Sequence, residues 1–175
     1  MQQETQQNNQ SILKVKPFQE TLGKGNCGPA SLKMVLDYYG IRKTEDELVK
    51  LLKADEKLGT NDKSLEKVAK FFGFNVDIKN HSSLEDIRGW LNKDVPVIVD
   101  WFTRGRQDYS DSAVPDGHYS VVIDLDDKYI YLQDPEIGKI RKIEKNDFLT
   151  VWFDFTGEYI KPDELIIRQL IAIYK

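Results

Sequence analysis

The chain has 175 residues, of which 40% are hydrophobic and 31% are charged. This length and composition fit one globular domain with a sizeable apolar interior. The formal net charge of −4 gives no electrostatic reason to expect a nucleic acid or an anionic membrane as partner. No apolar run is long enough for a transmembrane helix, and one cysteine with two histidines excludes an internal disulfide and argues against a structural zinc site.

The sequence divides into a short arm and one domain. Residues 1–16 are expected to form a flexible N-terminal arm, because the first ten are rich in glutamine and asparagine and show no signal-peptide pattern. Residues 17–175 contain no internal repeat and no interior linker, so a single domain is expected. A free reactive thiol suits a reducing compartment. We therefore expect a cytoplasmic location, with an exported bacterial protein as the alternative.

The stretch at 26–40, NCGPASLKMVLDYYG, predicts a buried helix that starts beside the only cysteine, Cys27. Pro29 suits a first helical position, and Gly28 is interpreted as supplying the extended geometry needed before proline. Gly40 ends the helix. Unpaired N–H groups at a helix start stabilise a thiolate, so Cys27 is a candidate nucleophile; the alternative is a small apolar core residue. The apolar positions follow helical spacing: Leu32, Val35, Leu36 and Tyr39.

The remaining patterns group helices before strands. A capping box from Thr44 to Glu47 starts the second helix, and β-branched and aromatic residues dominate the later segments. In chain order we predict helices at 44–52, 65–72 and 83–91, strands at 74–78, 95–102, 117–125, 128–133 and 139–145, a short helix at 146–152 capped by Asn146, and a strand at 165–174. Because the elements are grouped and do not alternate, the fold class is α+β, with the cysteine helix packed on an antiparallel sheet.

Two residues of the predicted meander supply a base and a group to orient it. His118 opens a strand directly after the polar loop 103–116, and Asp134 ends the next strand of the hairpin. Antiparallel pairing brings the start of one strand beside the end of the next, so we expect the carboxylate near the imidazole. A carboxylate on one ring nitrogen leaves the other free to face a thiol. The alternatives are a half-buried structural histidine and a turn-starting aspartate, while His81 is interpreted as a solvated loop residue.

Three motifs in this order, NCGPASLKM, GHYSVVI and YIYLQDP, resemble the papain-like peptidases that process double-glycine bacteriocin leaders. The resemblance implies a papain-like α+β fold, with a helical N-terminal lobe whose central cysteine helix packs on a C-terminal antiparallel sheet. It also implies a thiol peptidase with Cys27, His118 and Asp134 as catalytic residues. An upstream glutamine, here Gln19, would donate to the oxyanion. The expected partner is a peptide or protein substrate, and no cofactor or metal is implied.

The chain departs from that family in two respects. The glutamine usually stands six positions before the cysteine, where this chain has Thr21, whereas Gln19 stands eight positions before Cys27. Family members are often fused to a membrane transporter, and no transmembrane segment is expected here. The function expected is hydrolysis of a peptide bond, in a cleft lined by Trp101 and the loop 103–116. The alternatives are an inactive peptide-binding module, an acyltransferase using the same residues, and a structural partner that exposes Trp101 and Phe102.

Overall fold

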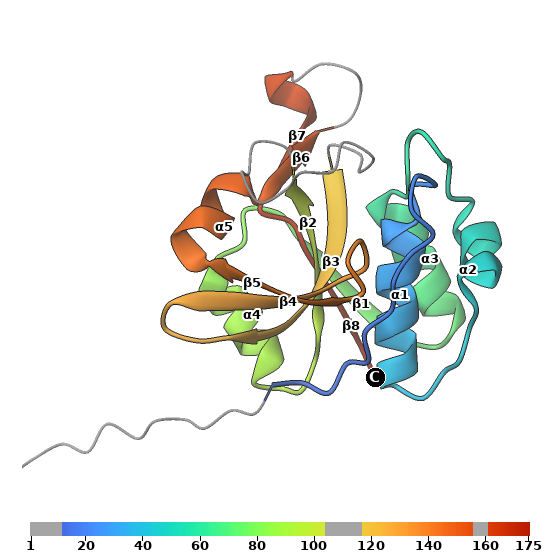
Figure 1. Ribbon diagram of the computed structural model, residues 1–175, viewed down its shortest axis with the longest axis horizontal. Helices are drawn as coiled ribbons and strands as arrows, with labels where there is room; N and C mark the ends of the chain where they lie inside the picture. Colours follow the sequence, from blue (N-terminus) through green and yellow to red (C-terminus); the bar gives the residue numbers. More distant parts are fainter. Residues whose placement is uncertain (1–11, 104–116, 156–160) are drawn as a thin grey trace, which may run out of the picture.

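The computed structural model describes residues 12–103, 117–155 and 161–175. Its first half is mainly helical and its second half mainly strands, as the sequence predicts (Figure 1). The helices are α1 (Cys27–Tyr38), α2 (Glu45–Leu52), α3 (Asp62–Phe71), α4 (Leu84–Leu91) and α5 (Lys145–Val151), with a 3₁₀ turn at Pro162–Glu164. The strands are β1 (Asn75–Lys79), β2 (Val97–Phe102), β3 (Gly117–Leu125), β4 (Tyr129–Asp134), β5 (Lys139–Glu144), β6 (Phe153–Phe155), β7 (Leu165–Ile167) and β8 (Leu170–Tyr174).

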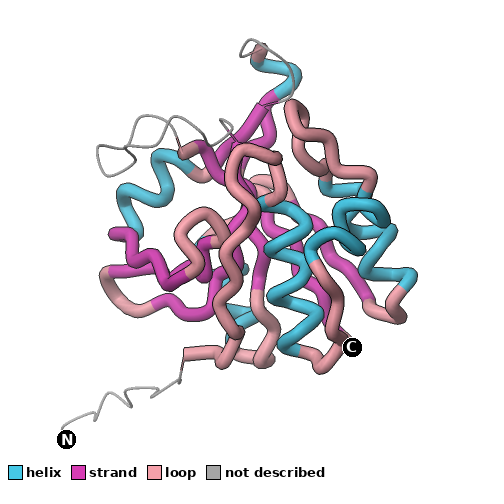
Figure 2. Tube along the Cα trace, turned by 45° about the vertical axis from the view of Figure 1, so that its right-hand side comes forward, coloured by secondary structure: helices cyan, strands magenta, loops and turns pink. Residues whose placement is uncertain are grey.

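Six of these strands form one antiparallel sheet in the order β1-β8-β2-β3-β4-β5, and β6 pairs with β7 in a separate ribbon. Helices α1, α2 and α3 gather on one side of the sheet and α5 lies on the other, and the turned view in Figure 2 keeps this separation. Three parts of the structure lie toward the upper side of Figure 1: the start of β3, the N-terminal end of α1 and the β6–β7 ribbon. The fold thus brings the predicted helix start and the predicted strand start to the same end of the molecule.

Local sequence patterns account for helices α1 and α2 but not for the start of α5. Helix α1 buries Leu32, Val35 and Leu36 completely, because its apolar residues recur at helical spacing on a wide face. Helix α2 carries the expected capping box between Thr44 and Glu47. The short helix α5 differs from expectation, since Glu144 precedes it and Asn146 lies inside it.

The ends of the chain differ most from the sequence-based expectation. Leu13 and Val15 are buried in the core, and the Gln133 side chain donates to the Val15 carbonyl. The packed chain therefore begins before the expected boundary at residue 16. The single strand expected at 165–174 is divided into β7 and β8 at Arg168, whose φ of 48° breaks the extended backbone.

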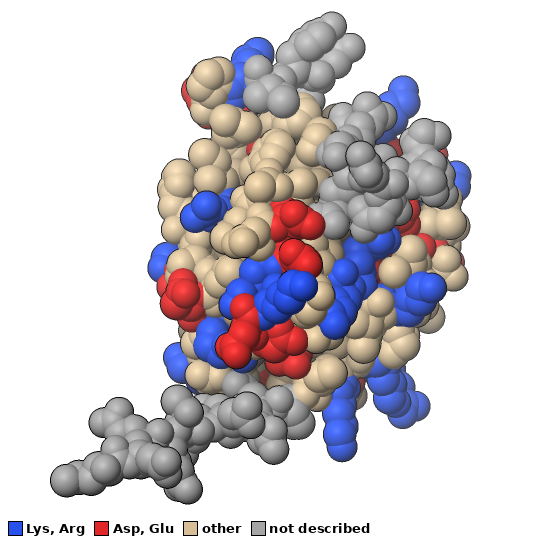
Figure 3. Space-filling model, turned by 60° about the vertical axis from the view of Figure 1, so that its left-hand side comes forward, with Lys and Arg blue, Asp and Glu red and all other residues tan. Residues whose placement is uncertain are grey.

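The face of the molecule in Figure 3 shows no patch that is uniformly basic or uniformly acidic. Basic and acidic side chains lie interspersed there, as on an ordinary solvated surface. Within the described ranges, no helix combines the length and the apolarity needed to span a bilayer.

Candidate active site

Cys27 is the first residue of α1, and it is 5% exposed. The start of a helix presents backbone N–H groups that have no partner within the helix, so the thiol lies where a negative charge is favoured. Gly28 lies inside α1, and a Cβ atom there would come within 2.8 Å of the Thr60 Cβ. Glycine at this position is thus explained by close packing against Thr60, and the extended geometry expected from the sequence is not observed.

His118 is the second residue of β3 and is completely buried. Its cross-strand partner in β2 is Trp101, whose ring centroid lies 5.9 Å from that of the imidazole. Trp101 is also fully buried, and its indole N–H donates to the Ser120 hydroxyl. Trp101 therefore supports the imidazole as part of the core and is not an exposed cleft wall. Of the loop 103–116 that was expected to share that role, residues 104–116 lie outside the described residues.

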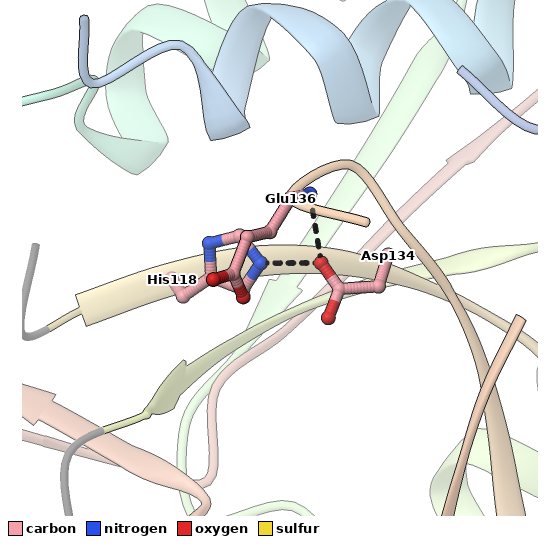
Figure 4. Close-up of side chains that lie close together, drawn as sticks. All are labelled: His118, Asp134 and Glu136. Atoms are coloured by element: carbon pink, nitrogen blue, oxygen red, sulfur yellow. Dashed lines mark hydrogen bonds and ion pairs between the residues drawn. The ribbon is translucent and has the colours of Figure 1, made fainter. Parts of the chain in front are cut away.

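Asp134 ends β4, and the β3–β4 hairpin brings its carboxylate to His118, as strand pairing predicts. One oxygen, Oδ1, lies 2.7 Å from His118 Nε2 and accepts the backbone N–H of Glu136 at 3.0 Å. The other, Oδ2, accepts from Nε of Arg141 at 2.6 Å. Figure 4 shows the imidazole and the Asp134 carboxylate facing each other, with Glu136 beside them.

The electrostatics favour the charged forms of this pair. Burial by itself lowers the pKa of His118, but the Asp134 carboxylate outweighs that effect and, together with the Cys27 side chain, raises the pKa well above 6.5. Burial by itself raises the pKa of Asp134, whereas His118 and Arg141 bring it well below its usual range. The Asp134 carboxylate thus stabilises the imidazolium that forms when His118 takes up a proton.

The second nitrogen of the imidazole remains available for chemistry. Nδ1 of His118 is buried and makes no hydrogen bond within the described part of the chain. The Cys27 side chain interacts with the ring and thereby raises the pKa of His118. A buried polar atom without a partner is costly. Such an atom beside a thiol is typical of a base that is poised to accept a proton.

Gln19 is located beside the turn that follows Asp134. Its side-chain N–H donates to the Glu136 carbonyl at 3.1 Å, and its Cβ packs so closely that a Cβ at Gly138 would lie 2.7 Å away. The neighbouring Glu20 N–H donates to the Pro135 carbonyl at 2.8 Å. The structure thus brings Gln19 to the candidate site, with its amide in a hydrogen bond to the backbone; its role as an oxyanion donor stays a prediction.

Sequence reasoning missed three charged residues here: Glu20, Glu136 and Arg141. Glu20 is 8% exposed, and burial raises its pKa to about 7, opposed by His118. No sequence signal distinguishes Glu20 or Glu136 from ordinary loop residues. Arg141 could have been found, because Asp134 pairs with Lys139 in β5, and strand alternation then places the residue two positions on at the same face.

Three of the buried groups could in principle hold a cation. Ligand atoms of His118, Asp134 and Glu136 lie within 4.8 Å of one another, and imidazole with carboxylates suits several divalent metals. Arg141, however, donates to both carboxylates, at 2.6 Å to Asp134 and 3.4 Å to Glu136. Its guanidinium already supplies the positive charge that a metal would bring, so we interpret the cluster as a hydrogen-bonded network.

His81, the second histidine, is unrelated to this site. It lies exposed in the connection between β1 and α4, as predicted, and its backbone is left-handed with a φ of 54°. The candidate site therefore combines Cys27, His118 and Asp134, and Gln19 is adjacent to it.

The fold of the chain is that of papain-like peptidase domains. The peptidase domain of Streptococcus ComA, a bifunctional ABC transporter of a quorum-sensing pathway, matches with a TM-score of 0.67 at 22% identity, over 91% of this chain and 98% of that chain. A double-glycine-motif protease from an AMS/PCAT transporter, solved in complex with the leader peptide, matches with a TM-score of 0.66 at 21% identity, over 95% and 96% of the two chains.

The sequence comparison extends this from fold to family. Residues 4–160 match the Peptidase_C39-like family, and the chain belongs to that family. A relative from Methanothermobacter marburgensis, an uncharacterized protein, is 33% identical over 135 residues, which cover 77% of this chain and 80% of the relative. Membership in this family supports a peptidase.

Proposed function

We propose that the protein is a cysteine peptidase that hydrolyses a peptide bond with Cys27 as nucleophile, His118 as general acid–base and Asp134 as the orienting carboxylate. The observation that carries the proposal is the buried 2.7 Å contact between His118 Nε2 and Asp134 Oδ1. The Cys27 side chain interacts with the same buried ring, whose other nitrogen, Nδ1, is not engaged by Asp134. Acyl transfer requires a nucleophile, a base that contacts it, and a group that orients the base.

The proposed reaction has two stages. The thiol proton passes to Nδ1 of His118, and Cys27 Sγ attacks the substrate carbonyl to form a tetrahedral intermediate. The imidazolium then protonates the leaving amine, so that an acyl-enzyme thioester remains. In the second stage His118 takes a proton from water, which attacks the thioester and releases the carboxylic acid and the thiol. Asp134 keeps the Nε2 proton in place throughout and stabilises the imidazolium.

Two donors are proposed for the developing oxyanion: the backbone N–H of Cys27 at the start of α1, and the side chain of Gln19. For Gln19 the proposal requires its amide to leave the Glu136 carbonyl, to which it donates at 3.1 Å. A side chain that is exposed to solvent and forms one neutral hydrogen bond can make this exchange at a cost of about 1 kcal/mol. The substrate class proposed is a peptide or protein, as in the relative solved with its leader peptide.

Replacing Gln19 with alanine tests the second donor. We expect kcat/KM on a peptide substrate to fall on the order of a hundredfold, because one oxyanion donor typically contributes that much. Thr21→Ala is the matched control, since Thr21 stands at the usual family spacing but its N–H and hydroxyl bind the Glu45 carboxylate at 2.9 and 2.7 Å. The Thr21 variant should stay within a few-fold of wild type. Equal, small losses in both variants would refute a catalytic role for Gln19.

The proposed thiol chemistry can be tested before any substrate is known, through alkylation of Cys27 by iodoacetamide. With a single cysteine in the chain, the modified site is unambiguous. We expect alkylation to remain fast at about pH 6, where an ordinary free thiol with pKa ≈ 8.5 is almost fully protonated. The reason is that the imidazolium of His118 stabilises the reactive thiolate.

The control compares the two histidines. His118→Ala should slow alkylation at pH 6 at least about tenfold, whereas the same change at the exposed His81 should leave the rate unchanged. If alkylation at pH 6 is slow in wild type and unaffected by either change, the thiol and the imidazole do not act together, and the peptidase proposal fails. Fast alkylation without cleavage of any peptide would instead favour a transferase or a binding module.

A further inference from the structure

Asp134 has a second charged partner that the proposed mechanism does not use. Its Oδ2 accepts from Arg141 Nε at 2.6 Å, and the same guanidinium reaches Glu136 Oε2 at 3.4 Å. Arg141 comes from β5, the strand next to the one that ends in Asp134. Its side chain is only 13% exposed, so this ion pair is screened far less than one on the surface. The guanidinium thereby connects the catalytic carboxylate to the turn that follows it.

Acidic groups are concentrated around His118. Glu136 lies beside the ring, Glu20 interacts with it from the N-terminal segment, and Asp100 does so from β2. Asp100 is in turn close to Asp154 of β6, and Cys27 faces the ring from α1. Each of these groups, when ionised, favours the protonated imidazole, as Asp134 does. An imidazolium that is held too strongly is a poor acid, because efficient proton transfer requires a pKa near the working pH.

We propose that Arg141 is a positioning residue of this active site, which fixes the Asp134 carboxylate against His118 and offsets the surrounding negative charge so that the imidazolium can release its proton. The inference rests on the proposed function. Positioning follows from geometry, because the guanidinium holds one carboxylate oxygen while the other accepts from the imidazole. The offset follows from charge, because the guanidinium stays protonated at every pH at which the protein is folded.

The titration of His118 provides a direct test that needs no substrate. NMR of histidine side chains in a Cys27→Ala background follows the imidazole without coupling to the thiol. The chain has two histidines, so exposed His81 serves as an internal reference. Arg141→Gln should raise the His118 midpoint by about half a unit to one unit, since it removes a neighbouring positive charge. The His81 midpoint should not move.

Two further variants separate charge from general structural damage. Arg141→Lys keeps the charge, so the His118 midpoint should stay at its original value. Lys142→Gln removes a cation from the adjacent, exposed position of the same strand, where its ammonium lies over the ring of Tyr129, and it should also leave His118 unchanged. An unchanged midpoint in Arg141→Gln, or an equal shift in Lys142→Gln, would overturn the charge part of the proposal. Should the glutamine variant not fold, Arg141→Met in the same titration answers the same question.

Activity tests the positioning part. Lysine cannot hold Asp134 and Glu136 in the fork geometry of a guanidinium, so Arg141→Lys should lower kcat on the order of tenfold or more, with little change in KM. Wild-type kcat in Arg141→Lys would refute positioning. If wild type cleaves no peptide, the function proposed above fails, yet the His118 titration still decides whether Arg141 offsets the charge around the imidazole.

Discussion

Cys27→Ser is expected to abolish peptide hydrolysis, with a fall in kcat on the order of ten-thousandfold or more. Serine replaces sulfur with a less acidic and less nucleophilic oxygen in nearly the same volume. The buried position at the start of α1 therefore keeps its packing while the attacking group is lost. Effects of this size accompany removal of a nucleophile that acts as a unit with its base. Turnover of a fluorogenic peptide, normalised to the folded fraction, measures the loss.

A second small residue on the same helix provides the control. Ser31 lies one turn after Cys27, is completely buried, and its hydroxyl has no hydrogen bond within the described residues. Ser31→Ala should therefore keep kcat within about twofold, since removing an unpaired buried hydroxyl costs little. Activity retained in Cys27→Ser would assign the hydrolysis to another group or to a contaminant. Equal losses in both variants would indicate damage to α1 instead of loss of the nucleophile.

Asp134→Asn is expected to lower kcat roughly a thousandfold or more, the second-largest effect. Both carboxylate oxygens are acceptors: Oδ1 from His118 and the Glu136 N–H, and Oδ2 from Arg141. An amide has one oxygen, so either orientation places its NH₂ group against a donor. If the NH₂ group faces the imidazole, Nε2 must become an acceptor and the ring proton moves to Nδ1. Nδ1 can then no longer accept the thiol proton. Loss of the correct tautomer explains the large effect of this change in triads.

The measurement for Asp134 is the kcat of the variant beside that of Asp127→Asn. Asp127 lies exposed in the β3–β4 turn of the same hairpin, so its amide should leave kcat within about twofold. The fall in Asp134→Asn should persist across the pH range, because a tautomer defect is not corrected by adding or removing protons from solvent. Recovery of wild-type kcat at any pH would show that Asp134 contributes only charge.

Local features of this chain could be predicted because they depend on neighbouring residues. The buried helix α1, the capping box of α2 and the hairpin that joins β3 to β4 all follow from spacing and short-range hydrogen bonds. The start of α1 was expected at Pro29, whereas the helix begins two residues earlier, at Cys27. Even the contact of His118 with Asp134, 16 positions apart, follows from the pairing of adjacent strands. The family resemblance rests on these same segments, and family membership and fold are both confirmed.

Contacts between distant segments required the tertiary structure. Strand β8 lies between β1 and β2, and Gln19 meets Glu136 across 117 positions. No periodicity encodes such pairings, because they depend on which surfaces remain to be buried after local elements have formed. Gly28 illustrates the same limit: its local neighbour Pro29 suggested an extended backbone, whereas the observed constraint is the side chain of Thr60.

The sequence by itself therefore predicted a class of chemistry, by placing one cysteine at a helix start and one histidine and one aspartate on adjoining strands. Only the tertiary structure decided the electrostatic environment of those residues. Glu20, Asp100 and Arg141 reach His118 or its carboxylate partner from separate elements. The strength of a charge interaction depends on distance and burial, which are set by the packing of the whole chain.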